Sequence, residues 1–168
     1  VLARMQPGDI VLASPRLGRL SPIALAYRVL LRSRYVHSML YLGDERIIHT
    51  TARHGVVVGR VPGKVFDRRR YVVYRVPGLT EAQRRRVVEY ALAQLERGLD
   101  HAALVSNIPS RWLGLRRPLW RLEEGRLWCS KLIADAYRTG ADVDLVPDQD
   151  DETVVTEDFH RSPRLQEI

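Results

Sequence analysis

Cys129, the only cysteine in this chain of 168 residues, has the strongest nucleophilic potential. Apolar residues recur after it at helical spacing, which predicts a helix whose first turn carries Cys129 on the same inward-facing side as Leu132, Ile133, Ala136 and Tyr137. A thiol at a helix N-terminus faces the positive end of the dipole and unpaired amides, and both favour the thiolate. The alternative is a small buried core cysteine, the commoner role of a lone cysteine on an apolar face.

A cysteine nucleophile needs a base, and the base needs a group that orients it. His37 and His49 lie on two predicted strands, 36–42 and 46–51, which a turn at residues 43–45 joins into a hairpin. Whether the two imidazoles meet depends on the register of this hairpin.

A three-residue loop pairs Leu42 with Arg46. Met39 then lies opposite His49, and His37 lies on the same face at the diagonal position, where side chains can touch. A two-residue loop shifts the register by one residue and places the two histidines on opposite faces. The three-residue loop is therefore the register that favours chemistry.

The other three histidines, His54, His101 and His160, fall in polar or turn-like surroundings and are interpreted as ordinary polar residues. Two histidines and a distant cysteine could bind zinc, but the sequence has no second cysteine and no closely spaced pair of ligands. We therefore expect neither a metal nor an organic cofactor.

The charge is strongly positive and unevenly placed. The net charge of +7 comes from 25 arginines and only two lysines, whereas residues 139–168 hold nine acidic residues against two arginines. We expect this acidic segment to fold back over the basic body. The arginine clusters lack interleaved aromatic residues for stacking, so nucleic-acid binding is not predicted, while attraction to an anionic polymer or membrane surface stays open.

The remaining elements predict an α+β fold in a single domain, 1–168. Strand-like runs bounded by turn signals occur at 10–13, 36–42, 46–51, 55–61 and 71–76. Helices are predicted after Ser21-Pro22, from the capping box at 80–83 to about residue 97, over 129–139 with Gly140 as the stop, and as one turn at 156–159. Because strands and helices do not alternate, we expect an antiparallel sheet or small barrel packed against the cysteine-bearing helix.

Residues 100–127 contain prolines, glycines and two tryptophans, Trp112 and Trp120, and predict short helical turns within a long loop. Because the segment ends just before Cys129, we expect part of it to line the cleft above the sulfur. No apolar run is long enough to cross a membrane, and no signal peptide is visible. The compartment, cell envelope or cytoplasm, and the oligomeric state stay open.

Four short motifs follow one another in an order that resembles the NlpC-type papain-like superfamily. They are residues 7–12, 37–43, 46–49 and 128–133. More narrowly, they resemble its circularly permuted branch, in which the histidine strand precedes the cysteine helix, and to which lecithin:retinol acyltransferase and YiiX-like bacterial hydrolases belong. The resemblance implies a permuted papain-like fold. It also implies that Cys129 is the nucleophile, His37 the base and His49 the second histidine, although some YiiX-like members have a carboxylate at that third position.

The resemblance implies a cysteine hydrolase that cleaves an amide or ester through a thioester acyl-enzyme, with a cell-wall peptide (peptidoglycan fragment) or a lipid-like molecule as substrate. The alternatives are a thiol acyltransferase or phospholipase on lipids, and a non-catalytic module that binds an anionic polymer. Trp128 stands where the non-permuted peptidases have an aspartate that recognises a peptide amine, so the chain departs from their pattern there.

Overall fold

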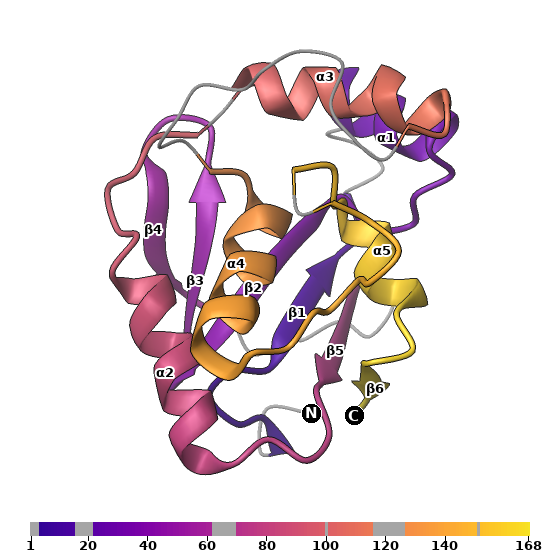
Figure 1. Ribbon diagram of the computed structural model, residues 1–168. Helices are drawn as coiled ribbons and strands as arrows, with labels where there is room; N and C mark the ends of the chain where they lie inside the picture. The colour runs from indigo at the N-terminus through magenta and orange to yellow at the C-terminus, as the bar shows by residue number, and fades with distance from the viewer. Residues whose placement is uncertain (1–3, 16–21, 62–69, 100, 116–126, 151) are drawn as a thin grey trace.

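The computed structural model describes residues 4–15, 22–61, 70–99, 101–115, 127–150 and 152–168 (Figure 1). The strands of its sheet are β1 (Ile10–Ala13), β2 (His37–Gly43), β3 (Arg46–Thr51), β4 (Gly55–Arg60), β5 (Tyr71–Arg75) and β6 (Gln166–Glu167). The helices are α1 (Pro22–Leu30), α2 (Glu81–Leu92), α3 (His101–Trp112), α4 (Cys129–Ala141) and α5 (Thr156–Arg161). The predicted α+β class is confirmed.

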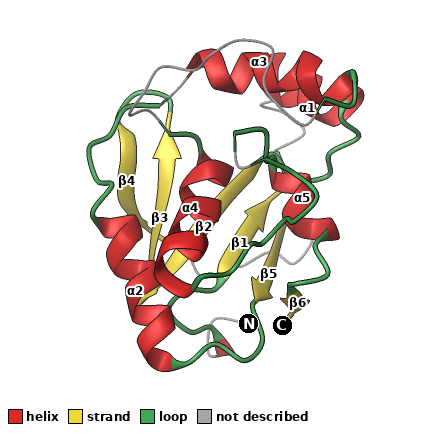
Figure 2. Ribbon diagram, viewed as in Figure 1, coloured by secondary structure: helices red, strands yellow, loops and turns green. Residues whose placement is uncertain are grey.

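The sheet is open and antiparallel, with the strand order β4-β3-β2-β1-β5-β6. Helices α2 and α4 pack side by side over one face of it (Figure 2). The main core lies between this face and the helices and includes Leu12, Leu40, Ile48 and Ile133. A smaller apolar cluster, with Met39 and Ile47, lies on the other face. Alternating residues along β2 therefore face two different cores.

The hairpin of β2 and β3 has the predicted register of its strands, but its turn differs from the predicted one. Gly43 pairs with Arg46, so the loop has two residues, and Asp44 and Glu45 both have positive φ (51° and 57°). A bulge before Gly43 then shifts the register by one residue, and Leu40 pairs with Ile48. The expected three-residue loop is wrong. The bulge compensates for the shorter turn, and the register of the strands is the one that brings the histidines to one face.

Helix α2 begins at the predicted capping box, where Thr80 and Gln83 bond each other reciprocally, but it ends at Leu92 rather than near residue 97. The chain leaves the helix because Glu96 and Arg97 form backbone hydrogen bonds with Val56 of β4. Glu96 N donates to Val56 O at 3.1 Å, and Val56 N donates to Arg97 O at 2.9 Å. Along the apolar side of this segment Ala91 is buried and Val88 is partly buried, whereas Leu92 and Leu95 are exposed.

Residues 101–112 form the helix α3, which corrects the prediction of a loop with short turns. Pro109 lies inside this helix, and the helical hydrogen bonding continues past it, since Leu113 N donates to Pro109 O at 3.0 Å. Residues 116–126, including Trp120, lie outside the described residues.

Helix α4 begins at Cys129 as predicted, but Gly140 is not its stop. Gly140 lies within the last turn, and Asp142 ends the helix with φ 57°. A Cβ at Gly140 would lie 2.5 Å from Val87 N of α2, so the glycine is needed for the close approach of two helices. The acidic C-terminal segment folds back onto basic side chains, as predicted: Glu152 pairs with Lys131 at 2.8 Å, and Asp158 pairs with an arginine of α3.

Candidate active site

Cys129 is the first residue of α4, and it is buried, with 7% of its surface exposed to solvent. The preceding residue, Trp128, caps the helix through its extended backbone and offers no side-chain cap. Its indole is buried and donates to Val154 O at 3.1 Å, which fixes the start of the helix. No side chain of the N-cap residue therefore occupies the amides of the first turn.

His37 and His49 lie on the same face of the hairpin and contact each other. His37 Nε2 lies 2.9 Å from His49 Nδ1, and the two rings meet edge to face with their centroids 5.1 Å apart. His37 also hydrogen-bonds Cys129. Because Nε2 of His37 faces His49, its Nδ1 is the nitrogen left for the sulfur. The structure thus brings the three predicted residues into one chain of contacts.

The Cys129 thiol is poised to ionise near neutral pH. Burial alone would raise its pKa, but the hydrogen bond and charge of His37 outweigh burial, with help from Ser38, and lower the pKa from 9.0 to about 6. A structural cysteine in an apolar core would show the opposite shift. The environment of Cys129 is therefore that of a reactive thiol.

Ser38 is a contributor that the sequence analysis missed. Alternation along β2 turns it toward α4, and both its hydroxyl and its backbone N–H lower the pKa of Cys129. Its Oγ is buried and makes no hydrogen bond of regular geometry among the described residues. The signal in the sequence was only its place beside His37, in a strand position where an apolar residue would fill the core.

His49 stays neutral at neutral pH. Burial lowers its pKa, the positive charge of His37 lowers it further, and a backbone hydrogen bond at Thr50 opposes them, with a result of about 4. Across the sheet, a Cβ at Gly59 would lie 3.4 Å from His49 Nε2, so the glycine leaves room for the ring. A neutral His49 can accept a hydrogen bond at Nδ1 when His37 carries two protons.

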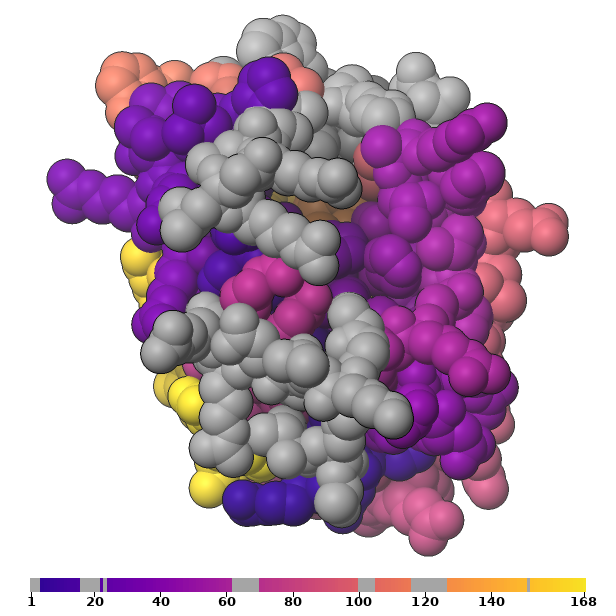
Figure 3. Space-filling view, turned by 180° about the vertical axis from the view of Figure 1, so that it is seen from behind, coloured from indigo at the N-terminus to yellow at the C-terminus, as the bar shows by residue number. Residues whose placement is uncertain are grey.

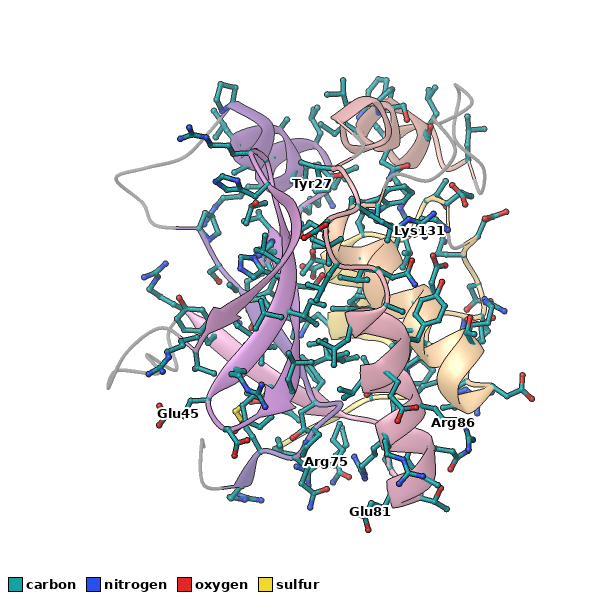
Figure 4. All side chains as sticks on the ribbon, turned by 90° about the vertical axis from the view of Figure 1, so that its left-hand side faces the viewer. Tyr27, Glu45, Arg75, Glu81, Arg86 and Lys131 are labelled. Carbon is teal, nitrogen blue, oxygen red and sulfur yellow. The ribbon has the colours of Figure 1, made fainter. Side chains whose placement is uncertain are left out.

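Tyr27 of α1 is a second residue that the sequence analysis did not connect with Cys129. Its hydroxyl is buried, and its pKa is raised first by burial and then by the nearby negative charges of Cys129 and Asp158. It lies at the same end of the molecule as Lys131 in the first turn of α4, while Arg75 and Glu81 lie at the opposite end (Figure 4). The raised pKa keeps the phenol protonated at neutral pH, so it can donate a hydrogen bond.

The remaining candidates lie elsewhere. His160 Nδ1 lies 2.6 Å from the hydroxyl of Tyr74, His54 is in an exposed turn, and His101 is the first residue of α3. Trp112 is exposed and lines a pocket of about 310 Å³ between α1, α3 and α5. That part of residues 100–127 lines the cleft above Cys129 stays a prediction. Among the described residues, no group of three or more histidine, cysteine or acidic side chains is arranged to hold a metal.

Comparison with known proteins shows the fold. Neither the protein-family models nor the curated protein sequences match the chain. A crystal structure described as that of the metalloprotein YiiX from Escherichia coli O157:H7 is similar, with a TM-score of 0.68 and 16% sequence identity, over 97% of this chain and 96% of the other. The chain therefore has a YiiX-like fold.

Proposed function

We propose that this chain is a papain-like cysteine hydrolase of the permuted NlpC type. The observation that carries the proposal is the continuous contact of Cys129, His37 and His49, which come from a helix and a hairpin far apart in the sequence. A nucleophile, a base and an orienting group in contact are the parts of a catalytic triad, which is recognised by geometry rather than by sequence position.

In the proposed reaction, the Cys129 thiolate attacks the carbonyl carbon of an amide or ester. The tetrahedral oxyanion accepts hydrogen bonds from the amides at the start of α4 and from the Tyr27 hydroxyl. His37 gives its Nδ1 proton to the leaving amine or alcohol, which leaves a thioester on the sulfur. Water then attacks the thioester, His37 takes up its proton, and the acid product departs. His49 holds the His37 ring through Nδ1.

The substrate class of the proposal is a cell-wall peptide or a lipid-like ester or amide. Trp128 is buried with its indole bonded to Val154, so this position cannot offer the carboxylate with which the related peptidases bind a peptide amine. Acyl transfer to an alcohol or amine follows the same course if an acceptor replaces water. A panel of muropeptides and phospholipids, with and without an acceptor, separates these substrates by the products that form.

A metal centre does not fit the residues of this site, although the YiiX structure is described as that of a metalloprotein. His37 Nε2 and His49 Nδ1 lie 2.9 Å apart and face each other, so their lone pairs cannot converge on an ion. The described part of the chain supplies no cluster of three ligands. The proposed steps therefore pass through the side chains alone.

The test is the ionisation and acylation of Cys129. Titration of thiolate absorbance near 240 nm should give a midpoint near pH 6 in the wild type and near or above the free value of about 8.5 in His37→Ala. Alkylation by iodoacetamide should follow the same curve. Because the sulfur is only 7% exposed, the absorbance measurement keeps the test valid if alkylation is slow.

Acylation is tested with an activated ester followed by mass spectrometry of the intact protein. We expect one acyl group in the wild type, none in Cys129→Ser, and slower acylation in Tyr27→Phe without a change of the thiol midpoint. If the wild type shows no thiolate below pH 8 and no acyl adduct, Cys129 is a core residue and the non-catalytic binding module becomes the better hypothesis.

A further inference from the structure

Exposed apolar side chains gather on two helices. Ten large hydrophobic residues are exposed in the described part of the chain, and seven of them belong to α1, α3 and the turn after α3. We call this set the α1–α3 face: Leu25, Val29, Leu30, Val105, Trp112, Leu113 and Leu115. The two helices pack against each other at one end of the molecule, where their surfaces adjoin in the view from behind (Figure 3).

Residues 105–112, the part of α3 whose side chains the structure describes, bury polar side chains and expose two large apolar ones. This part buries Ser106, Asn107 and Ser110, while Val105 is 51% and Trp112 66% exposed. Asn107 is fully buried, and its amide has no hydrogen-bond partner in the described residues. A water-facing helix of a globular protein turns its apolar side inward. An apolar outer face of this kind fits a helix that meets an apolar phase.

The charge around the face is positive. Among the described residues, Arg28 lies in α1, Arg32 and Arg34 follow it directly, and all three are exposed. Residues 22–43 and 101–115 contain no acidic residue. The carboxylates that approach from α5 are already engaged: Asp158 pairs with Arg111, and Glu157 accepts from Arg34 N at 2.7 Å and pairs with Arg161 at 3.4 Å. Arginine beside exposed tryptophan and leucine complements anionic headgroups above acyl chains.

We propose that the α1–α3 face docks on the surface of a bilayer that contains anionic lipid. In this docking, α1 and α3 lie in the interface with their exposed apolar side chains toward the lipid. Among the described residues no helix is long and apolar enough to cross a membrane. The N-terminal end of α4, which begins at Cys129, points toward the end of the molecule that carries α1 and α3 (Figure 1). The docking does not depend on catalysis by Cys129.

The test is cosedimentation of the whole chain with vesicles of phosphatidylcholine, with and without 30% phosphatidylglycerol (a composition of roughly physiological anionic content). We expect binding to the anionic vesicles that weakens as salt rises. The double variant Val29→Glu/Val105→Glu should bind at least about tenfold more weakly, since it places carboxylates in the interface. The matched control is Val58→Glu/Leu92→Glu, two exposed apolar residues outside the face, which should bind like the wild type.

Two further measurements identify the contact. On vesicle binding Trp112 should move to a less polar environment, so the blue shift of tryptophan fluorescence should be lost in Trp112→Phe. Cys129→Ser should bind like the wild type, which separates this proposal from that of a hydrolase. The proposal is overturned if the wild type binds neither vesicle, if the Val29→Glu/Val105→Glu and control variants bind alike, or if the former dissociates a dimer in sedimentation velocity, since the face would then meet a second copy of the chain.

Discussion

The two ends of α4 are held in different ways. At the C-terminal end, the Tyr137 hydroxyl donates to Gly8 O, and Arg86 Nε of α2 donates to Gly140 O at 2.9 Å. Asp142, with φ 57°, closes the last turn through its backbone N–H. This end carries no group of unusual reactivity. Its hydrogen bonds fix the helix to α2 and to the turn before β1.

At the N-terminal end, no side chain caps the helix, and the buried Cys129 lies beside His37 and Ser38. Here His37 and Ser38 of β2 favour the thiolate of Cys129. The difference indicates a division of roles within one helix: changes at the C-terminal end should alter stability and leave the thiol pKa alone, whereas changes at the N-terminal end should mainly alter the pKa.

The largest expected effect lies beside the C-terminal end, in the turn that receives Tyr137. Asp9 is fully buried and accepts from Arg75 Nε at 2.8 Å and from Nη2 at 2.7 Å. In Arg75→Met this carboxylate loses its charged partner. We expect the free energy of unfolding, measured by urea denaturation, to fall by about 3–5 kcal/mol. The control Arg85→Met breaks an exposed pair with Glu89 and should change it by less than about 1 kcal/mol. A shift of the Cys129 pKa in Arg75→Met would contradict the division of roles between the two ends of α4.

The second effect concerns Gly140. Alanine is the better helix former by about 1 kcal/mol, yet its Cβ would lie 2.5 Å from Val87 N, a backbone atom that cannot move alone. We expect Gly140→Ala to lower the free energy of unfolding by about 1–3 kcal/mol, because α2 and α4 must separate. Calorimetry with a parallel thiol titration checks this. Unchanged or higher stability would show that the close approach is not needed.

Sequence patterns predicted the elements whose signals are local. The alternation in β2 and β3, the capping box at Thr80 and the apolar stripe after Cys129 each specify a backbone conformation without a distant partner. The common face of His37 and His49 was predictable for the same reason, because period-two geometry fixes it once the register is known.

The rest depends on contacts that a linear pattern does not contain. Gly140 looks like a helix stop until Val87 of α2 is placed against it. The end of α2 depends on hydrogen bonds with Val56, a residue in a strand. Packing also determines the bulge before Gly43 and the continuation of α3 through Pro109, because the local sequence is compatible with more than one conformation at each place. Ser38 gains its place beside the sulfur only when α4 covers β2.

The third effect is a dependence of stability on pH at the site itself. His49 has a pKa of about 4 in the folded chain and 6.5 when unperturbed. Between these values the unfolded chain binds a proton that the folded chain does not, so stability is retained above pH 6.5 and falls as the pH drops toward 4. We expect a loss of about 1–3 kcal/mol over this window. Urea unfolding at pH 7.5, 6 and 5 should show a smaller loss in His49→Asn, and equal losses would contradict the assignment.

The smallest effect tests the N-terminal end of α4 most directly. The Ser38 hydroxyl stabilises the Cys129 thiolate, while the backbone N–H of the same residue remains in Ser38→Ala. The pKa of Cys129 should therefore rise by only about one unit. Because this buried hydroxyl makes no hydrogen bond of regular geometry among the described residues, the free energy of unfolding should change by less than about 1 kcal/mol. The matched control is Ser162→Ala, whose buried hydroxyl donates to Leu145 O at 2.5 Å, and it should lose stability without a shift of the thiol midpoint. If Ser38→Ala instead unfolds more easily and titrates like the wild type, the serine belongs to the packing of the core, and His37 alone sets the ionisation of the sulfur.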